Sequence, residues 1–381
     1  MRILLAQTGY LGDLTLTLPV VQHLRNSFPD ATIDCLVKKG HEDLITTHPA
    51  ISNVLIFDKE GKDSGFSGIL KASKRLTAKR YSIALVPPGS IRTAFVVYLA
   101  RIPRRIGTNY GSGLLLFEDV LKFPKELESS PPGKSVLLIE RLWRALGGKR
   151  SLVSTMFTDT VTLDRRRPAI QRHLQLLEPL GISTQEGLLV PELHPSAQDI
   201  KSVNTILHGF GTDRLMAVAP GSVWHTKQWP LEYYVRLVQS LVRRGIGVAL
   251  VGGGEDIPLA RGIISAVNDR VIDTCGKLTP IQSAELLKRC RVLVTNDSAP
   301  MHLASAVGTR CVVILGPTVR EFGFTPVGNE HVIMERQSLW CRPCTPHGGE
   351  RCPIGTHECM TGISVEQVAN TVFRLIDSES T

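Results

Sequence analysis

The chain has 381 residues, enough for two domains that each bury a hydrophobic core. Hydrophobic residues make up 43% of it and charged residues 21%, which is typical of a globular protein and argues against disorder. The formal net charge of +9 favours acidic partners, such as phosphorylated substrates or an anionic membrane surface. Basic residues are scattered and no DNA- or RNA-binding module is recognisable, so we expect no nucleic-acid partner.

Short apolar runs alternate with amphipathic stretches through the first half of the chain. The pattern predicts strands at 3–6, 32–37, 54–57 and 83–86 and helices at 14–27, 69–78, 136–146 and 169–180. Alternation of this kind is typical of a parallel sheet covered by helices on both faces. The first apolar run meets glycine and aspartate too soon for a signal peptide, and no apolar run is long enough to span a bilayer. We therefore expect a cytoplasmic protein.

An extended linker is expected between residues 181 and 213, and a second series of strands and helices follows it. The predicted elements are a strand at 215–218, a helix at 231–244, a strand at 248–251, a strand–helix–strand unit over 292–318 and a last helix at 364–378. The sequence therefore predicts an α/β protein with two Rossmann-like domains, residues 1–190 and 191–381, that face one another across a central cleft.

Three loops of the second domain each follow an apolar strand and carry polar residues. Asp297 and Ser298 lie at the start of a helix, whose free N–H groups favour an anion. The segment 219–230 contributes the cation Lys227, and the glycine-rich segment after the next strand contributes Glu255. Ligands of doubly wound sheets bind at the carboxyl ends of the strands, so these loops should converge on a nucleotide diphosphate. The alternative is that the first two residues only cap a helix and that the lysine is a surface cation.

Eight cysteines are distributed unevenly along the chain. Four lie in or beside apolar segments and are predicted to be core residues: Cys35, Cys275, Cys290 and Cys311. The other four form a C-x2-C-x7-C-x6-C pattern in the cysteine loop, residues 341–359: Cys341, Cys344, Cys352 and Cys359. Such a cluster suggests either a structural zinc site or free or redox-active thiols. The loop holds no obvious base, so its role is expected to be structural.

Two segments place cations close to apolar residues, at 101–105 and at 113–117. They are compatible with peripheral contact with a membrane surface. The alternative is a buried strand with arginines on the surface beside it.

Several short motifs occur in an order and spacing that resemble a known family. They are Gly12-Asp13, Pro220-Gly221 with Lys227-Gln-Trp-Pro230, Gly252-Gly-Gly-Glu255, Thr295-Asn-Asp-Ser298 with Met301-His302, Gly316-Pro-Thr318, and the segment Cys352 to Met360. The set resembles the family 9 glycosyltransferases, in particular the ADP-heptose:lipopolysaccharide heptosyltransferases of the second type. The resemblance covers nearly the whole chain. It implies the two-domain GT-B fold, with the acceptor on the first domain and the nucleotide sugar on the second.

The resemblance also implies roles for single residues. Asp13 is the expected catalytic base, Lys227 the cation that binds the diphosphate, and Glu255 the acid that binds the ribose. The remaining donor-binding residues are the phosphate-turn residues Ser298, Ala299 and His302, with Asp297 before them and Ser222 nearby, and Lys277 in the loop that contacts adenine. Pro300 lacks an N–H, which reduces the donors that this turn offers.

The implied reaction is transfer of a heptose from ADP-heptose to the inner core of lipopolysaccharide, with inversion and without a required cofactor. The acceptor is an anionic glycolipid, so contact with the cytoplasmic face of the inner membrane is expected. The alternatives are a GT-B enzyme that uses another nucleotide sugar or acceptor, and a nucleotide-binding protein of the same fold without turnover.

Overall fold

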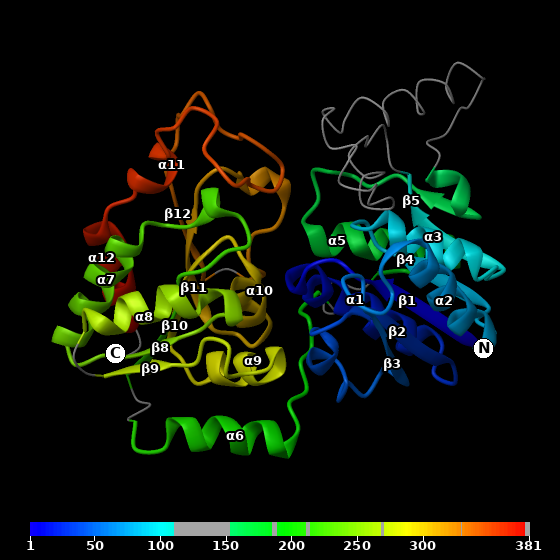
Figure 1. Cartoon of the computed structure of the whole chain (residues 1–381), viewed down its shortest axis with the longest axis horizontal. Coiled ribbons are helices and arrows are strands. Elements are labelled where there is room, and N and C mark those ends of the chain that lie inside the picture. Colours follow the sequence, from blue (N-terminus) through cyan, green and yellow to red (C-terminus); the bar gives the residue numbers. More distant parts are fainter. Residues whose placement is uncertain (110–152, 185–188, 211–213, 268–269, 329, 378–381) are drawn as a thin grey trace. The chain divides into compact units, whose positions relative to one another are not determined.

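A computed structural model describes residues 1–109, 153–184, 189–210, 214–267, 270–328 and 330–377. The chain divides into two compact units, Met1–Pro191 and Glu192–Thr381 (Figure 1). The helix predicted at 136–146 and the segment 113–117 lie outside the described residues.

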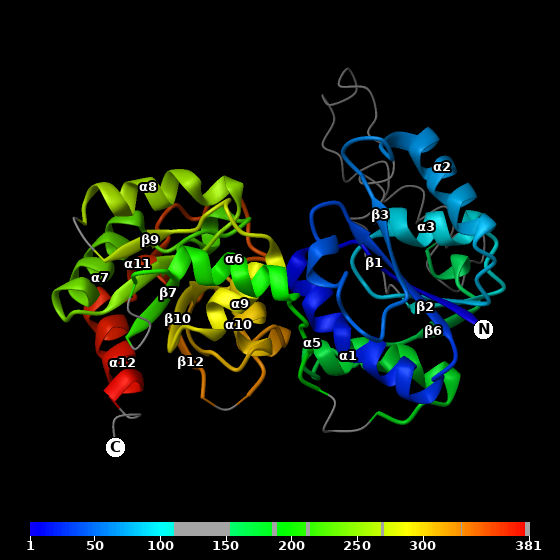
Figure 2. The same cartoon turned by 90° about the horizontal axis from the view of Figure 1, so that it is seen from below.

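The first unit is a parallel sheet of six strands with helices on both faces. The strands are β1 (Arg2–Gln7), β2 (Thr32–Lys38), β3 (Asn53–Phe57), β4 (Ile83–Val86), β5 (Arg104–Thr108) and β6 (Asp159–Val161), in the order β3-β2-β1-β4-β5-β6. Its helices are α1 (Leu11–Ser27), α2 (Gly65–Ala78), α3 (Ile91–Leu99) and α5 (Ala169–Leu174), with 3-10 turns η1 (Glu42–Leu44), η4 (Ser154–Met156) and η5 (Gln175–Leu180). Helices α2 and α3 pack together on one face, and α1 and α5 pack together on the other (Figure 2).

The central strands of this sheet are apolar along their whole length because both faces are covered. In β1, residues 3–6 are at most 1% exposed, as expected for a strand buried on both sides. One carboxylate, that of Asp34 on β2, lies among them and is fully buried. It accepts hydrogen bonds from Tyr81 Oη at 2.6 Å, Asn53 Nδ2 at 2.8 Å and Arg2 Nη2 at 3.1 Å. These partners offset the cost of burying the charge.

The second unit has the same architecture. Its strands are β7 (Leu215–Ala219), β8 (Gly247–Leu250), β9 (Val271–Asp273), β10 (Val292–Asn296), β11 (Arg310–Leu315) and β12 (Val332–Glu335), in the order β12-β11-β10-β7-β8-β9. Its helices are α6 (Ala197–Leu207), α7 (Leu231–Arg243), α8 (Ile257–Ser265), α9 (Pro280–Lys288), α10 (Ala299–Ala306), α11 (Glu358–Thr361) and α12 (Val365–Asp377), with 3-10 turns η7 (His225–Lys227), η8 (Gly254–Asp256) and η9 (Arg320–Phe322). Helix α7 packs between α8 and α12, while α9 packs with α6 and α10.

Both sheets reverse their strand order at one point. In the first unit the reversal falls between β1 and β4, and in the second between β7 and β10. The loops that leave these neighbouring strands run to opposite faces of the sheet and leave a crevice at the carboxyl ends. This strand order is that of the Rossmann fold, so the predicted fold class of two parallel α/β units is confirmed.

Several helix boundaries differ from those predicted. Helix α2 begins at Gly65, four residues before the predicted start. Helix α1 begins at Leu11, three residues before the predicted start, so Asp13 lies inside its first turn. The helix predicted at 169–180 is α-helical only to Leu174 and continues as the 3-10 turn η5. Pro179 lies in that turn, and because proline has no N–H it cannot donate the bond that would continue an α-helix.

The arginine-rich segment at 101–105 leads into a buried strand. Ile106 of β5 is fully buried, Arg104 pairs with Asp159 at 3.3 Å, and the guanidinium of Arg105 lies over the ring of Tyr98 at 5.6 Å. The structure therefore favours the buried-strand interpretation of this segment over membrane contact. In the part of the chain that the structure describes, no helix is long and apolar enough to span a membrane.

Candidate functional site

The crevice of the second unit holds an ion pair between two residues that the sequence singled out. Lys227, at the end of η7, places its Nζ 2.7 Å from Oδ2 of Asp297, which follows β10. Both side chains are largely buried, with 12% and 10% exposed. Thr318, after β11, donates its hydroxyl to the same carboxylate oxygen at 2.8 Å. The loops after β7, β10 and β11 therefore meet at one carboxylate.

Asn296, the last residue of β10, fixes the loop after β7 in place. Its Nδ2 donates to the carbonyl oxygens of Pro220 at 2.8 Å and Gly221 at 3.2 Å. Its Oδ1 accepts from the N–H of Trp229 at 3.1 Å and from the hydroxyl of Tyr234 at 2.9 Å. Asn296 belongs to the motif Thr295-Asn-Asp-Ser298, but nothing in the sequence predicts its role. Its position at the end of a strand in the crevice is the signal that could have found it.

The N-terminus of α10 faces the same crevice. Ser298 is the N-cap residue, but its side chain makes no capping bond to the helix. Pro300 has no N–H, and the N–H of Met301 donates to Ser298 O at 3.1 Å. Within the described part of the chain, Ala299 is thus the residue of this first turn whose N–H can face an anion. The proline reduces the donors of the turn, as the sequence indicated.

The loop after β8 approaches the loop after β7 through a partly buried acid. Asp256 accepts the N–H of Gly253 at 2.8 Å, and its carboxylate lies so close to Gly221 that a Cβ there would be 1.7 Å from Oδ1. Burial raises the pKa of Asp256, the hydrogen bond from Gly253 opposes the rise, and the charge of Glu255 adds to it. Glu255 itself is exposed on η8. The sequence predicted a role for Glu255 but not for Asp256 beside it. Because the Asp256 carboxylate lies so close, residue 221 has no room for a side chain and is a glycine.

Lys277 lies in the loop between β9 and α9. Its Nζ donates to the side chain of Asp273 at 2.8 Å and to the carbonyl of the same residue at 2.9 Å, and the lysine side chain is 58% exposed. The preceding Gly276, with φ +69°, donates its N–H to Gly252 O at 3.0 Å. The structure therefore brings the loop of Lys277 beside the loop of Glu255.

Ser222 and His302 lie at different depths in the site. Ser222 is partly exposed, and its carbonyl accepts from Gln228 Nε2 at 2.8 Å. His302, on α10, is 7% exposed, and its Nδ1 has no hydrogen-bond partner within the described residues. Burial lowers the pKa of His302 to about 4, Asp297 opposes the shift, and Lys227 contributes to it. The ring is therefore neutral at pH 7.

In the first unit, Asp13 lies in the first turn of α1. Its Oδ2 accepts the N–H of Tyr10, the N-cap residue, at 3.3 Å, so the carboxylate does take part in capping. Burial lowers the pKa of Arg172 on α5, and the charge of Asp13 opposes that shift, so the two side chains are close enough to interact. Arg172 had no role in the sequence analysis because 159 positions separate it from the aspartate.

The loops of the same crevice are tied by buried polar contacts. Lys59, after β3, donates from Nζ to Thr8 O at 2.8 Å and to Ser90 Oγ at 2.9 Å. The hydroxyls of Thr8 and Thr93 form a hydrogen bond. Loops after β1, β3 and β4 are thereby joined around one cation.

The cysteine loop gathers its four thiols, and all cysteines described in the structure are free. Three of them, Cys344, Cys352 and Cys359, line one cavity together with His357. Burial raises the pKa of Cys359 to about 11, with the neighbouring thiolates, first that of Cys344, adding to the rise. Burial also opposes ionisation of Cys352, but N–H groups of residues 354–357 point at its sulfur and lower its pKa overall. Within the described chain the thiols do not close into a complete ligand shell.

His347, in the cysteine loop, was not among the predicted site residues. Partial burial lowers its pKa, the charge of Lys227 lowers it further, and Asp297 opposes the shift. The imidazole is therefore within electrostatic reach of the central ion pair. Only the fold reveals this, because 120 positions separate His347 from Lys227.

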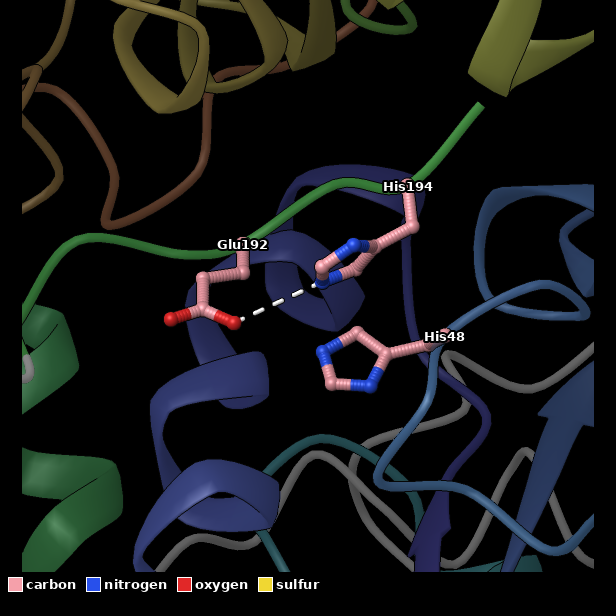
Figure 3. A group of neighbouring side chains, drawn as sticks. All are labelled: His48, Glu192 and His194. Carbon is pink, nitrogen blue, oxygen red and sulfur yellow. Dashed lines mark ion pairs between the residues drawn. The ribbon is translucent and has the colours of Figure 1, made fainter. Parts of the chain in front are cut away.

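A further ion pair lies at the start of the second unit. Figure 3 shows Glu192 and His194 on one extended segment, with Oε2 of the acid 3.4 Å from Nε2 of the imidazole. The ring of His48, also drawn there, belongs to the first unit, where its Nδ1 accepts the N–H of Ala50 at 3.2 Å. The sequence analysis assigned no role to these residues.

Comparison with known proteins places these observations in a family. The model of glycosyltransferase family 9 (heptosyltransferase) matches residues 141–351. The lipooligosaccharide heptosyltransferase 2 of Haemophilus influenzae is 23% identical, over 84% of this chain and 85% of that protein. The lipopolysaccharide heptosyltransferase 2 of Escherichia coli is 25% identical, over 84% of each. The solved structure of E. coli ADP-heptose LPS heptosyltransferase II covers 100% of both chains with a TM-score of 0.74 and 21% identity, so the fold is GT-B.

We expect His302→Gln to weaken the pH dependence of stability. In the wild type the unfolded chain binds a proton near pH 6.5, whereas folded His302 does so only near pH 4. The contribution of His302 to the free energy of unfolding is therefore complete above pH 6.5 and is lost as the pH falls toward 4. The loss is of order 1–3 kcal/mol. Guanidinium unfolding at pH 7 and pH 5 measures the difference. If the wild type and His302→Gln lose the same free energy of unfolding between pH 7 and pH 5, the prediction is wrong.

Proposed function

Because this chain belongs to glycosyltransferase family 9, we propose that it transfers a heptose from ADP-heptose to the inner core of lipopolysaccharide. The observation that carries the proposal is the crevice of the second unit, where a lysine, an aspartate and a helix N-terminus meet at the reversal of strand order. Such a point is where doubly wound sheets bind nucleotides. The names of the relatives supply the sugar and the acceptor class.

The diphosphate of the donor takes its charge compensation from the chain. Lys227 supplies the cation, and the N-terminus of α10 at Ser298 and Ala299 supplies the positive end of a helix dipole. In the absence of donor Lys227 is paired with Asp297, so the pair has no net charge and the phosphate must share the lysine. This arrangement stabilises the negative charge that gathers on the leaving diphosphate.

The nucleoside is assigned to the two loops that follow β8 and β9. An exposed carboxylate such as that of Glu255 accepts hydrogen bonds from the paired hydroxyls of a ribose. The loop of Gly276 and Lys277 lies directly beside it and is assigned to adenine. Ser222 and His302 complete the proposed donor site.

Asp13 is the proposed base. An alcohol is a poor nucleophile at neutral pH, so a carboxylate takes its proton as the new bond forms. The acceptor oxygen attacks the anomeric carbon, the bond to the diphosphate breaks, and ADP leaves with the electron pair. Attack opposite the leaving group inverts the anomeric configuration. The proposed transfer uses no metal, because Lys227 and the N-terminus of α10 supply positive charge to the leaving diphosphate.

The anionic acceptor is a membrane lipid, so the proposed site of action is the cytoplasmic face of the inner membrane, with peripheral contact. Purified protein incubated with ADP-heptose and a heptose-bearing core acceptor tests the function. A heptosylated product supports it. Turnover only with another sugar donor identifies a different glycosyltransferase, and tight nucleotide binding without product identifies a binding protein of this fold.

The first prediction concerns the donor cation. Lys227→Ala should weaken ADP binding by about 1.5–3 kcal/mol, because a charge-assisted contact to phosphate is lost. Isothermal titration calorimetry with ADP measures this, and Lys288→Ala, which changes an exposed lysine in the last turn of α9, serves for comparison. A folded Lys227→Ala protein with unchanged ADP affinity and unchanged rate removes the lysine from the site.

The second prediction concerns the base. Asp13→Asn keeps an oxygen that can accept the N–H of Tyr10 and caps a helix as well as aspartate does. Turnover should fall by about 10²–10⁴-fold because the proton acceptor is lost, while the melting temperature and ADP affinity stay close to wild type. Rates at saturating donor and acceptor decide the matter. Near-normal turnover would leave Asp13 with its capping role alone.

The third prediction concerns the cysteine loop, for which we propose a structural zinc ion. Thiolates are the ligands that structural zinc prefers, and Cys344, Cys352 and Cys359 line one cavity with His357. The described thiols do not form a closed shell by themselves, so a bound ion would draw them together. Purified protein should then contain about one equivalent of zinc, and chelation should lower its melting temperature. Elemental analysis and thermal unfolding with and without chelator measure both quantities. Metal-free protein of full stability contradicts the proposal and favours free thiols.

A further inference from the structure

Thr226, the residue before Lys227, is held by the cysteine loop through every polar atom it has. Its N–H donates to Gly349 O at 3.0 Å, and its Oγ1 accepts the N–H of Gly349 at 2.8 Å. Its carbonyl oxygen lies 2.8 Å from Nε2 of His357. The threonine is 6% exposed, so these bonds are shielded from water. The cysteine loop, more than 120 positions further along the chain, thus holds the turn that carries Lys227 through hydrogen bonds.

The cysteine loop also packs against the lysine stem itself. Gly348 has φ +97°, and a Cβ at this residue would lie 3.2 Å from Cγ of Lys227 and 2.9 Å from Cβ of Trp224. Thr345 fixes this turn, because its hydroxyl donates to Gly348 O at 2.9 Å and accepts the N–H of Gly348 at 2.7 Å. The backbone approaches the lysine closely where a side chain would collide with it.

The same loop supports the other partner of the ion pair. Arg342 donates from Nη2 to Thr318 O at 2.7 Å, and the N–H of Cys344 donates to Pro317 O at 3.1 Å. The hydroxyl of Thr318 in turn donates to Asp297. Both Lys227 and Asp297 are therefore backed by residues of one loop.

We propose that Thr226 is a positioning residue for donor binding, through which the cysteine loop holds Lys227 in the direction of the diphosphate. A lysine stem has four rotatable bonds, and fixing its base before the ligand arrives lowers the ordering cost of binding. The inference rests on the proposed donor site. It assigns to the cysteine loop a role in donor affinity, and it holds whether the thiols bind a metal or stay free.

Thr226→Val tests the proposal, because valine has nearly the same shape and removes the hydroxyl that accepts from Gly349. We expect the Kd for ADP and the KM for donor to rise about 5- to 20-fold, with a smaller change in kcat, since the buried N–H of Gly349 loses its partner. Thr226→Ser retains the hydroxyl and should restore values within about twofold of wild type. Titration calorimetry with ADP and steady-state kinetics provide the readouts.

Thr309→Val is the matched control. Thr309 is a buried threonine of the same unit, 4% exposed, whose hydroxyl donates to Leu287 O at 2.7 Å away from the ion pair. It should lower the melting temperature as Thr226→Val does but leave ADP affinity unchanged. If Thr226→Val does not fold, His357→Leu removes the imidazole from the Thr226 carbonyl and should raise the same Kd.

The outcomes separate the two proposals. If Lys227→Ala weakens ADP binding but neither Thr226→Val nor His357→Leu does, the positioning role is wrong and the donor site stands. If Lys227→Ala also leaves ADP affinity unchanged, the donor site itself is wrong. Equal loss of affinity in Thr226→Val and Thr309→Val would assign the effect to general destabilisation and overturn the inference.

Discussion

The carboxamide of Asn296 is the constraint on which the crevice of the second unit depends. Its two N–H groups and both acceptor positions of its oxygen are used, so the amide has one orientation that satisfies every bond. The side chain is fully buried, and in a low-dielectric interior the loss of any of these bonds is costly. These bonds connect the end of β10 to the loop after β7. This connection through Asn296 sets the spacing between Lys227 and the N-terminus of α10.

The ion pair of Lys227 and Asp297 lies at the centre of the proposed donor site. Because Lys227 and Asp297 are both largely buried, neither charge is stable there alone, and each gives the other a partner when no ligand is present. In the proposed donor site, a diphosphate replaces part of the interaction of Lys227 with Asp297 and adds an interaction with the N-terminus of α10. Affinity then depends on how well the lysine is held in place, which is the role given to the cysteine loop. A lysine whose position is fixed can stabilise a phosphate even when a neighbouring carboxylate balances its charge.

The fold class could be predicted because parallel strands that are covered on both faces must be apolar throughout. The apolar runs that form β1 and β7 can be recognised in the sequence without any knowledge of contacts. The sequence also predicted that loops after β7, β8 and β10 converge, since that follows from strand direction alone. It could not predict the pairing of Lys227 with Asp297, because 70 positions separate the two residues and no sequence pattern links them. The hydrogen bonds between Gly349 and Thr226 could not be predicted either, because contacts across 123 positions leave no periodic pattern in the sequence.

The two units show that one topology supports different chemistry. Both sheets reverse strand order in the same way, yet the crevice of the second holds a lysine–aspartate pair and a helix N-terminus, whereas that of the first holds Lys59 between Thr8 and Ser90, with Asp13 and Arg172 close by. The sheet fixes where loops end, and the residues on those loops decide what is bound. In the first unit α1 starts earlier than predicted, so Asp13 lies in the first helical turn, where its Oδ2 accepts the N–H of Tyr10. A carboxylate has several acceptor positions, so one capping contact and the proposed role as base are compatible rather than alternatives.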